Sequence, residues 1–358
     1  MLAISPSRLI VSAGSNLYSY AFNASSSNAT SPSVIFEGVI SLLGRFENER
    51  TITALTFIDD GGFDRTLHVA FQDGAIERVL LTQSTSSHVN HSTSLSAIQT
   101  NLNPMAIGDF VESLSSEANS ILTLSSMGYV SLSDLRSECT NSSSSTIELN
   151  TRSWIAHLCL QSSTPYAAFG TSSSTPLIVH SITDSQISPR PFAVLHTSKS
   201  IQPATDRPHF SAVYGLSRGP LNSPWGSSPQ ILVSGWFDGN VRCYDLRSSS
   251  RTEPISGEPC TPAPLRPVLS LADRWSNEPI YSVSCGGGSA SYIAAGTARH
   301  SVVSFWDVRS PKNGWSVHAP GNDPSPVYSV VLESSRFFGA TQSRPFVYDF
   351  VSLYHLHT

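Results

Sequence analysis

The chain has 358 residues, which is long enough for two ordinary domains or for one large all-β domain. Only 13% of the residues are charged, and glycine (22) and proline (23) are frequent, so we expect short strands and many turns rather than long helices. The formal net charge of -5 lacks the basic footprint that binding to a nucleic-acid backbone requires, so we expect no nucleic-acid partner.

The sequence also lacks the signals of a membrane or secreted protein. No run approaches the roughly 20 apolar residues of a membrane span, and the first residues lack a basic segment followed by an apolar one. We therefore expect a cytoplasmic or nuclear protein without membrane contact.

The cysteines and histidines indicate no metal site. The five cysteines are far apart and form no C-x-x-C pair, so we expect reduced, buried thiols: Cys139, Cys159, Cys243, Cys260 and Cys285. Two histidine pairs, His88 with His91 and His355 with His357, have no cysteine or carboxylate nearby in the sequence to complete a ligand set. We predict neither a metal nor a cofactor.

One unit recurs along the chain: an apolar run, a tight turn and a strand of alternating polarity. The first copy spans residues 8–22, and its innermost strand is expected at residues 2–5 or is supplied by residues 351–357. The second copy has three strands in sequence, at residues 52–58, 67–71 and 75–81, which is typical of a β-meander.

Five further copies follow, at residues 121–136, 154–182, 213–247, 280–309 and 327–350. Seven copies predict a single all-β domain, a seven-bladed β-propeller, because each unit must bury its apolar faces against its neighbours. The predicted blades are residues 1–45, 46–119, 120–150, 151–208, 209–278, 279–325 and 326–358.

The fullest copy ends in the hairpin of residues 231–247, ILVSGWFDGNVRCYDLR. Asp238 and Gly239 form its turn, because glycine tolerates positive φ and aspartate bonds its own backbone. In the second strand, the period of two places Val241, Cys243 and Leu246 on one side and Asn240, Arg242 and Tyr244 on the other. Closing aspartates recur at Asp245, Asp307 and Asp349, and the third copy likewise ends in Asp134-Leu135-Arg136.

Polar inserts separate the copies. They are rich in serine, threonine or proline and are expected to be mobile loops, because they bury too little apolar surface to offset the cost of ordering the chain. They cover residues 83–119, 137–150, 184–208, 248–279 and 311–326.

At this point the residues carry a family resemblance. The blocks GWFDGNVRCYDLR and SFWDVR resemble those of WD-repeat β-propellers, and the resemblance extends over nearly the whole chain. It implies that Asp73 and Asp238 are the family's turn aspartates and Trp306 its tryptophan, with Tyr244 standing in for tryptophan. The Gly-His dipeptide of the family is absent, so we expect the blades to depend on apolar packing.

A narrower resemblance covers the block VYGLSRGP, the hairpin of residues 231–247 and the ending RPFVYDF. Together they look like the WD-repeat half of fungal F-box proteins related to dactylin. This resemblance implies the substrate-recognition subunit of an SCF-type ubiquitin ligase, with a Skp1-type adaptor and a protein substrate as partners. No F-box is visible before residue 8.

Enzyme motifs are missing. There is no G-x-S-x-G sequence, Gly286–Gly288 opens no helix, and Asp59-Asp60 precedes two glycines as expected of a hairpin loop. A protein without catalytic residues is therefore expected.

Four residues remain as candidates for contact with a partner: Trp236, Arg242, Arg247 and Arg309. The sequence Trp306-Asp-Val-Arg309 resembles the motif by which some WD-repeat receptors bind the adaptor of cullin-4 ligases. The structural alternative, in which each aspartate and arginine cap a strand end, is preferred because such tripeptides recur in WD repeats of every function. Exposed aromatic residues beside turns, here Trp225, Trp236 and Phe237, would be suited to partner binding, and packing in the core is the alternative.

The leading hypothesis is thus a non-enzymatic protein-interaction platform, most specifically a ubiquitin-ligase substrate receptor. The alternatives are a cullin-4 adaptor-docking receptor, a general WD-repeat scaffold and, from a different class, a propeller enzyme.

Overall fold

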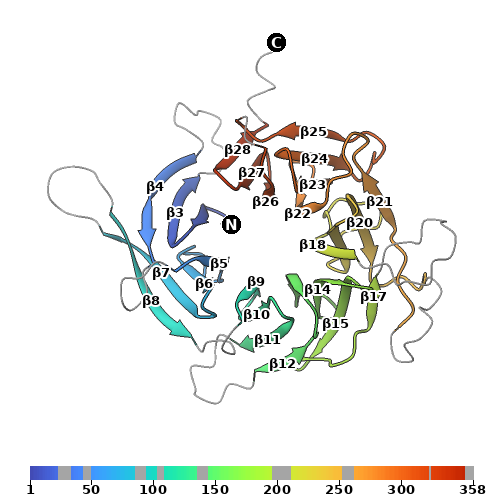
Figure 1. Ribbon diagram of the computed structural model, residues 1–358, viewed down its shortest axis with the longest axis horizontal. Helices are drawn as coiled ribbons and strands as arrows, with labels where there is room; N and C mark the ends of the chain where they lie inside the picture. The colour runs from blue at the N-terminus through green and yellow to red at the C-terminus, as the bar shows by residue number, and fades with distance from the viewer. Residues whose placement is uncertain are drawn as a thin grey trace, which may run out of the picture. The chain divides into compact units, whose positions relative to one another are not determined.

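The computed structural model describes residues 1–22, 34–42, 50–84, 94–102, 109–134, 144–195, 211–251, 262–321 and 324–350 (Figure 1). These residues form 28 β-strands and no helix. In this part of the chain, accordingly, no helix is long and apolar enough to cross a membrane. The chain divides into two compact units: Met1–Ser126 with Ser133–Ser143, and Met127–Leu132 with Ser144–Thr358.

The first unit contains two complete four-stranded antiparallel sheets and the β9–β10 pair. Its strands are β1 (Leu2–Ile4), β2 (Arg8–Ala13), β3 (Asn16–Phe22), β4 (Val34–Ser41), β5 (Ile52–Phe57), β6 (Thr66–Phe71), β7 (Ile76–Ser84), β8 (Ser94–Leu102), β9 (Val111–Glu117) and β10 (Ser120–Ser125). Side chains of β2, β3, β5, β6 and β7 pack into one core, with Ile10, Leu67 and Phe71 fully buried. The expected innermost strand at residues 2–5 is β1, while residues 351–357 lie outside the described residues.

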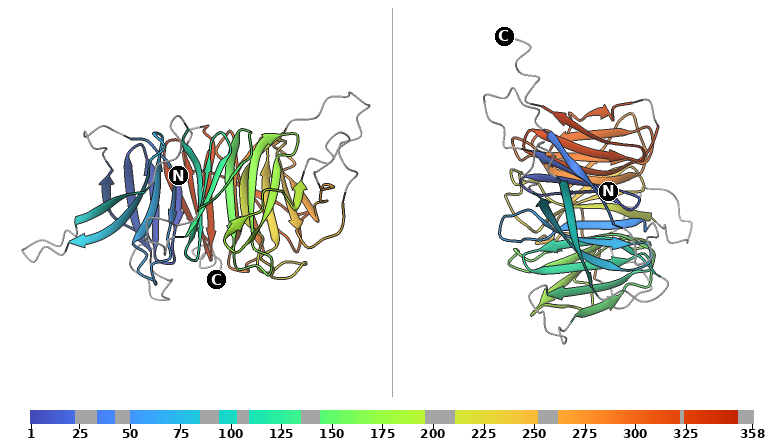
Figure 2. Two further views of the ribbon diagram at one scale, coloured as in Figure 1. Left: turned by 90° about the horizontal axis from the view of Figure 1, so that it is seen from below. Right: turned by 90° about the vertical axis from the view of Figure 1, so that its left-hand side faces the viewer.

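The second unit begins with the antiparallel pair β11 (Tyr129–Asp134) and β12 (Ser145–Glu148). A nine-stranded sheet follows, made of β13 (Ser153–Cys159), β14 (Tyr166–Ser173), β15 (Leu177–Thr183), β16 (Gln186–Ile187), β17 (Ala193–Leu195), β18 (Ser211–Arg218), β19 (Ile231–Trp236), β20 (Asn240–Asp245) and β21 (Leu269–Ala272). The last two sheets consist of β22 (Ile280–Gly286), β23 (Tyr292–Thr297), β24 (Val302–Asp307) and β25 (Trp315–His318), and of β26 (Val327–Glu333), β27 (Arg336–Thr341) and β28 (Pro345–Asp349). Within this unit, Figure 2 shows the strands of neighbouring sheets lying side by side.

These sheets form an all-β propeller, but the prediction of seven blades is wrong. Among the described residues, five separate sheets have three or four strands, as single blades do, and the sixth sheet has nine. The nine-stranded sheet arises because β14 extends past its hairpin partner β15. Its last two residues pair with β18 instead, Ser172 with Ala212 and Ser173 with Ser211, so that two predicted blades share one ladder.

The hairpin of residues 231–247 is confirmed. β19 and β20 pair with Ile231 opposite Asp245 and Gly235 opposite Val241, and Gly239 has φ +81° in the turn. The expected one-sided sheet is wrong, because both faces of β20 are buried. Val241 and Cys243 pack toward β22 and β23, whereas Tyr244 packs toward β14 and β15. Leu246 follows the end of the strand and joins Tyr244 rather than Val241.

The polar inserts are not only loops. β8, β12, β16, β17, β21 and β25 all lie within them and form outer strands. β9 also lies in an insert, within the predicted second blade, yet it pairs with β10. An outer strand has only one paired edge and needs little apolar sequence, which explains why these strands are hidden in polar segments.

Close approach between neighbouring sheets of the second unit depends on glycines in their second strands. A Cβ on Gly235 of β19 would lie 2.5 Å from Ile280 Cγ2, and one on Gly296 of β23 would lie 2.8 Å from Val327 Cγ1. Ile280 and Val327 each begin the first strand of the following sheet. The missing side chains thus let each first strand lie directly on the preceding sheet.

Candidate protein-interaction site

The first strands of the last four predicted blades, β13, β18, β22 and β26, share a β-bulge near their beginning. The pairing skips one residue between Ser153 and Ile155 in β13, and likewise between Val213 and Gly215 in β18. β22 and β26 have the same irregularity. The residue left out of the ladder is aromatic in all four strands: Trp154, Tyr214, Tyr281 and Tyr328. A bulge turns its extra residue out of the regular pleat, so these side chains are presented together.

The four rings, which we call the aromatic row, contact one another in chain order. Trp154 and Tyr214 have ring centroids 5.0 Å apart with an edge-to-face geometry, and so do Tyr214 and Tyr281. Tyr281 and Tyr328 follow at 6.0 Å. These separations are those of favourable aromatic pairs, so each ring helps to hold the next in place.

The aromatic row is partly solvent-exposed. Tyr328 is 49% exposed, and the other three rings are half-buried. Phe237, in the turn between β19 and β20, is 53% exposed, and its ring centroid lies 6.4 Å from that of Tyr214, so it widens the row. Rigid, exposed aromatic side chains are the commonest energetic centres of protein interfaces, because they bury a large area and lose little conformational entropy.

The ends and the polar groups of the row are also ordered. The Arg152 guanidinium lies 4.0 Å from the centre of the Trp154 ring, and Trp154 Nε1 donates a hydrogen bond of 2.7 Å to Ser172 Oγ. Burial, and then the neighbouring phenol of Tyr281, raises the pKa of Tyr214 above its ordinary value. Its hydroxyl therefore stays protonated and can donate a hydrogen bond to a partner.

Three of the sequence candidates form a cluster at the turn of residues 236–242, in which Trp236 and Arg242 are buried and Asp238 is exposed. Arg242 donates two hydrogen bonds to the carboxylate of Asp238, at 3.0 and 2.7 Å, and its guanidinium lies 4.8 Å from the centre of the Trp236 ring. Burial opposes ionisation of Asp238, but its hydrogen bonds with Arg242 and Asn240 outweigh burial and lower its pKa. Trp236 is 0% exposed and donates to Ser234 Oγ, so it offers no surface to a partner.

The first unit builds the same cluster from other sequence positions. Asp73 occupies the turn between β6 and β7, and Arg50, which precedes β5, bonds both to it at 2.9 Å and to Glu77 at 2.6 Å. The Arg50 guanidinium lies 3.8 Å from the centre of the Phe71 ring. A turn aspartate, a cation and an aromatic ring therefore recur, although the cation comes from a different strand.

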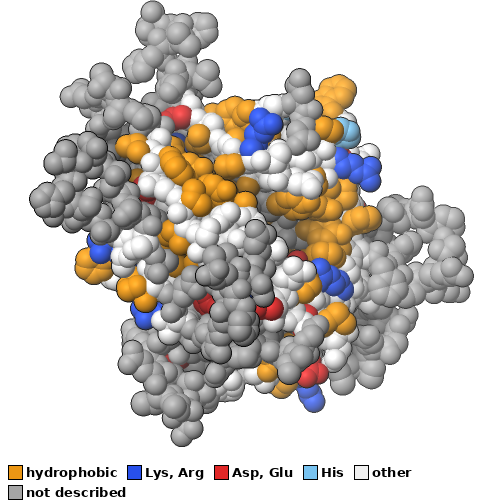
Figure 3. All heavy atoms as spheres, turned by 60° about the vertical axis from the view of Figure 1, so that its left-hand side comes forward, with side chains coloured by type: hydrophobic (Ala, Val, Ile, Leu, Met, Phe, Trp, Pro, Cys, Tyr) orange, Lys and Arg blue, Asp and Glu red, His pale blue; other side chains and the backbone are white. Residues whose placement is uncertain are grey.

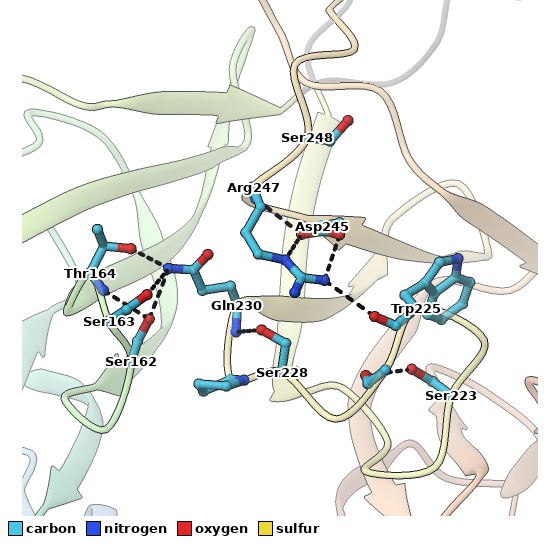
Figure 4. A network of polar contacts seen from close by, with 12 residues as sticks. Ser162, Ser163, Thr164, Ser223, Trp225, Ser228, Gln230, Asp245, Arg247 and Ser248 are labelled. Carbon is cyan, nitrogen blue, oxygen red and sulfur yellow. Dashed lines mark hydrogen bonds and ion pairs between the residues drawn. The ribbon is translucent and has the colours of Figure 1, made fainter.

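Arg247 caps the end of its strand. It bonds Asp245 through Nε and Nη2, both at 2.8 Å, and reaches the backbone oxygen of Trp225 at 3.2 Å (Figure 4). Its side chain is 46% exposed, while Trp225 packs partly against the core. Nearby, the buried amide of Gln230 donates to the hydroxyls of Ser162 and Thr164, which ties this strand end to the loop before β14.

Arg309 repeats this geometry at the end of β24. Its Nη2 donates to Asp307 at 2.6 Å, and the side chain is 48% exposed. The hydrogen bonds from Arg309 lower the pKa of Asp307 to about 2. Asp349 has a longer contact, 3.5 Å to Arg336 Nε in the neighbouring strand. The arginines at 247 and 309 are thus held by their own aspartates with one side open to solvent.

The two residues that represent the repeat's tryptophan are buried. Trp306 is 3% exposed, and Tyr244 is 0% exposed with a hydroxyl that has no partner among the described residues. Burial raises the pKa of Tyr244 well above its ordinary value. Both residues serve the packing between sheets.

The histidine, cysteine and acidic side chains of the described residues do not cluster as metal ligands. The described residues contain no group of three or more histidine, cysteine or acidic side chains that could hold a metal ion. His88, His91, His355 and His357 lie outside the described residues, as do Cys139 and Cys260. Burial raises the pKa of Cys285 to about 12 and that of Cys243 above its ordinary value, so both stay protonated at neutral pH.

Sequence reasoning missed the aromatic row. A signal was present, because each of the four residues is the second or fourth residue of the first strand in its copy. It was hidden because a bulge reverses which side of the strand a residue faces, and alternation alone cannot locate a bulge. On the face drawn in Figure 3, hydrophobic side chains gather in clusters and charged side chains are scattered among them.

Comparison with known proteins leaves the fold as the main guide. No protein-family model matches the chain, and no curated protein matches it. The chain is an all-β protein whose sheets are arranged as in a β-propeller, an arrangement compatible with a WD-repeat propeller.

Proposed function

We propose that the protein is a non-enzymatic protein-interaction platform whose partner binds the aromatic row. The observation that carries this proposal is the set of four bulges in β13, β18, β22 and β26, which turn Trp154, Tyr214, Tyr281 and Tyr328 toward one another. Packing of single sheets does not require an aromatic residue at each bulge, whereas aromatic residues are enriched at the energetic centres of recognition surfaces. β-propellers commonly serve as scaffolds, but the site rather than the fold supports the proposal.

More specifically, the platform is a substrate receptor of an SCF-type ubiquitin ligase. The sequence resemblance to F-box/WD-repeat proteins supports this part, and the aromatic row would contact the protein substrate. A Skp1-type adaptor is then the second partner, and the protein acts in the cytoplasm or nucleus.

A cullin-4 adaptor is the alternative partner, and one observation favours it. Arg309 is held by Asp307 with about half of its side chain exposed. A fixed guanidinium offers several donors in a planar arrangement, which suits a carboxylate or carbonyl of a docking protein.

Affinity purification from the native cell tests the proposal. Wild-type protein is compared with Tyr281→Ala/Tyr328→Ala and with Phe63→Ala, a control that removes a 67% exposed aromatic outside the row. We expect the double variant alone to lose a co-purifying protein. Equal recovery by all three proteins would refute the aromatic row as the binding surface.

The same purification distinguishes the ligase proposals. Recovery of a Skp1-type adaptor supports the first, and recovery of a cullin-4 adaptor that Arg309→Ala abolishes supports the second. If neither adaptor is recovered, both ligase proposals fail and the general scaffold remains.

A further inference from the structure

A separate cavity, of ≈ 400 Å³, lies at the outer edge of the second unit. It is bordered by the residues that follow β21 and by β24 and β25, the last of which is drawn as an outermost strand in Figure 1. Three of the chain's six tryptophans line it: Trp275, Trp306 and Trp315. Its volume falls in the range of sites that hold one small ligand or a few side chains.

Two of the tryptophans are fixed by their neighbours. Trp315 stacks on the buried ring of Phe305 with centroids 4.3 Å apart and an interplanar angle of 10°, and it remains 43% exposed. Trp306 is almost wholly buried, and Gly314 approaches it so closely that a Cβ there would overlap the indole. The cavity wall is therefore preorganised, which lowers the entropy lost on binding.

The third tryptophan is held by its backbone and not by its ring. Trp275 is 92% exposed, yet its N–H donates to Asp273 Oδ1 at 2.9 Å. The other oxygen of Asp273 accepts a hydrogen bond of 2.7 Å from Ser304 Oγ on β24. This carboxylate thus fixes the turn that carries Trp275 against the next sheet. Exposing a whole indole ring to water is unfavourable in free energy. A partner that covers the ring on binding would recover that free energy.

The charge available at the cavity is positive. Arg274 and Lys312 both line it and are exposed, and no described carboxylate lies within ion-pair distance of either. Asp273 also lines the cavity and keeps its negative charge, because the N–H and O–H groups that donate to it are neutral, so these three residues together leave a net charge of +1. An anionic ligand would therefore gain two cations, whereas a cationic ligand would meet repulsion from them.

We propose that this tryptophan cavity binds a linear acidic peptide segment of a partner protein, in which a bulky apolar side chain enters between Trp275 and Trp315 while flanking carboxylates meet Arg274 and Lys312. The inference rests on the proposed function as an interaction platform and adds a second surface to it. It does not depend on the aromatic row.

Selection from a random dodecapeptide library displayed on phage tests this proposal. The library is first depleted on Trp275→Ala protein and then selected on wild-type protein. Because Trp275 is almost fully exposed, its loss leaves the core unchanged, and thermal unfolding verifies that the variant is folded. We expect enriched peptides to combine aspartate or glutamate with an aromatic or large aliphatic residue.

One enriched peptide, labelled with fluorescein, is then titrated with each protein by fluorescence polarisation. Trp275→Ala and the double variant Arg274→Glu/Lys312→Glu should each weaken binding at least about tenfold, as expected for central contacts of an interface. Phe63→Ala, and Tyr281→Ala in the aromatic row, should leave binding unchanged.

Three outcomes would overturn the proposal: no enrichment over the depleted library, enrichment of peptides rich in lysine and arginine, or binding unaffected by Trp275→Ala. The proposed function has its own test, since loss of the native partner from Tyr281→Ala/Tyr328→Ala is independent of peptide binding to the tryptophan cavity.

Discussion

Two aspartate–arginine pairs in the same hairpin differ mainly in their depth. The Arg242 side chain is 9% exposed and lies beside the buried Trp236, whereas the Arg247 side chain is 46% exposed. Both pairs have nitrogen–oxygen distances of 2.7 to 2.8 Å. Geometry is therefore nearly constant, and the main difference is the burial of the guanidinium, since the carboxylates differ the other way: the Asp238 side chain is 35% exposed and the Asp245 side chain 18%.

Replacing these arginines separately should show the difference. Arg242→Leu removes a buried guanidinium that bonds Asp238 and packs against Trp236, so we expect the free energy of unfolding to fall by about 1–3 kcal/mol. Arg247→Leu should change it by less than about 1 kcal/mol. Urea unfolding followed by tryptophan fluorescence measures both, and equal losses would contradict the role of burial.

The pKa of Asp307 offers a test of the strand-end pairing. It lies at about 2 because Arg309 bonds the ionised carboxylate. Removing the cation by Arg309→Gln should raise this pKa toward the ordinary value of about 3.9. A carbon-detected NMR titration of the Asp307 carboxyl group measures it. An unchanged pKa would mean that Arg309 does not hold Asp307 in solution.

The low pKa of Asp307 also makes the free energy of unfolding depend on pH. Because the folded-state pKa of Asp307 is lower than the unfolded one, its contribution is present above about pH 4. It is lost as the pH falls toward 2, and Arg309→Gln should abolish that part of the acid sensitivity.

At the scale of the element, the second strand of one predicted blade in the second unit lies in close contact with the first strand of the next predicted blade. Gly170 of β14 illustrates this, because a Cβ there would lie 2.5 Å from the backbone oxygen of Val213. Val213 immediately precedes the bulge residue Tyr214. The spacing of the sheets and the presentation of the aromatic row therefore depend on the same contact.

Gly235→Ala should disturb that contact. The added methyl group would lie 2.5 Å from Ile280 Cγ2 and 3.1 Å from Ile280 Cβ, so we expect a loss of about 1–3 kcal/mol from overpacking. Gly288→Ala is the matched control, because no heavy atom lies within 4 Å of its added carbon. Thermal unfolding of both variants checks the prediction. A neutral Gly235→Ala would show that the sheets can separate without cost.

At the scale of the whole molecule, buried histidines connect stability to pH. Burial lowers the pKa of His68 to about 4, and a smaller contribution comes from Arg78; burial and Arg218 similarly lower the pKa of His157 to about 4. His68 is 1% exposed and lies in the first unit, and its Nδ1 has no partner among the described residues. Protonation of either ring would place an uncompensated charge inside a sheet.

The free energy of unfolding should therefore decrease as the pH is lowered from 6.5 to 4. The unfolded chain takes up a proton on each histidine below about pH 6.5, whereas the folded protein does so only near pH 4. Each histidine then contributes a slope of up to about 1.36 kcal/mol per pH unit within this window. Urea unfolding at several pH values measures the slope. His68→Leu should reduce it, and an unchanged slope would contradict burial of the neutral ring.

The hairpins were predictable because their signals are local. Asp238 with Gly239, and Asp73 with Gly74, specify tight turns, and the flanking residues alternate within a few positions. The sheets that contain them were therefore expected at nearly the observed positions. Which residues are available to a partner was harder to predict. Trp236 and Phe237 are neighbouring aromatic residues beside the same turn, but only Phe237 is exposed.

The sequence by itself determined the all-β class, the repeated hairpins and their turns, because turn chemistry and alternation act between residues that are close along the chain. The tertiary structure decided the outer strands within polar inserts, the joining of β14 to β18, and the two surfaces formed by tryptophans and tyrosines. Those features depend on residues far apart in sequence: Trp154 meets Tyr214 only because β13 and β18 place their bulges side by side. Likewise, Trp275 and Trp315 line one cavity only because two outer strands come together.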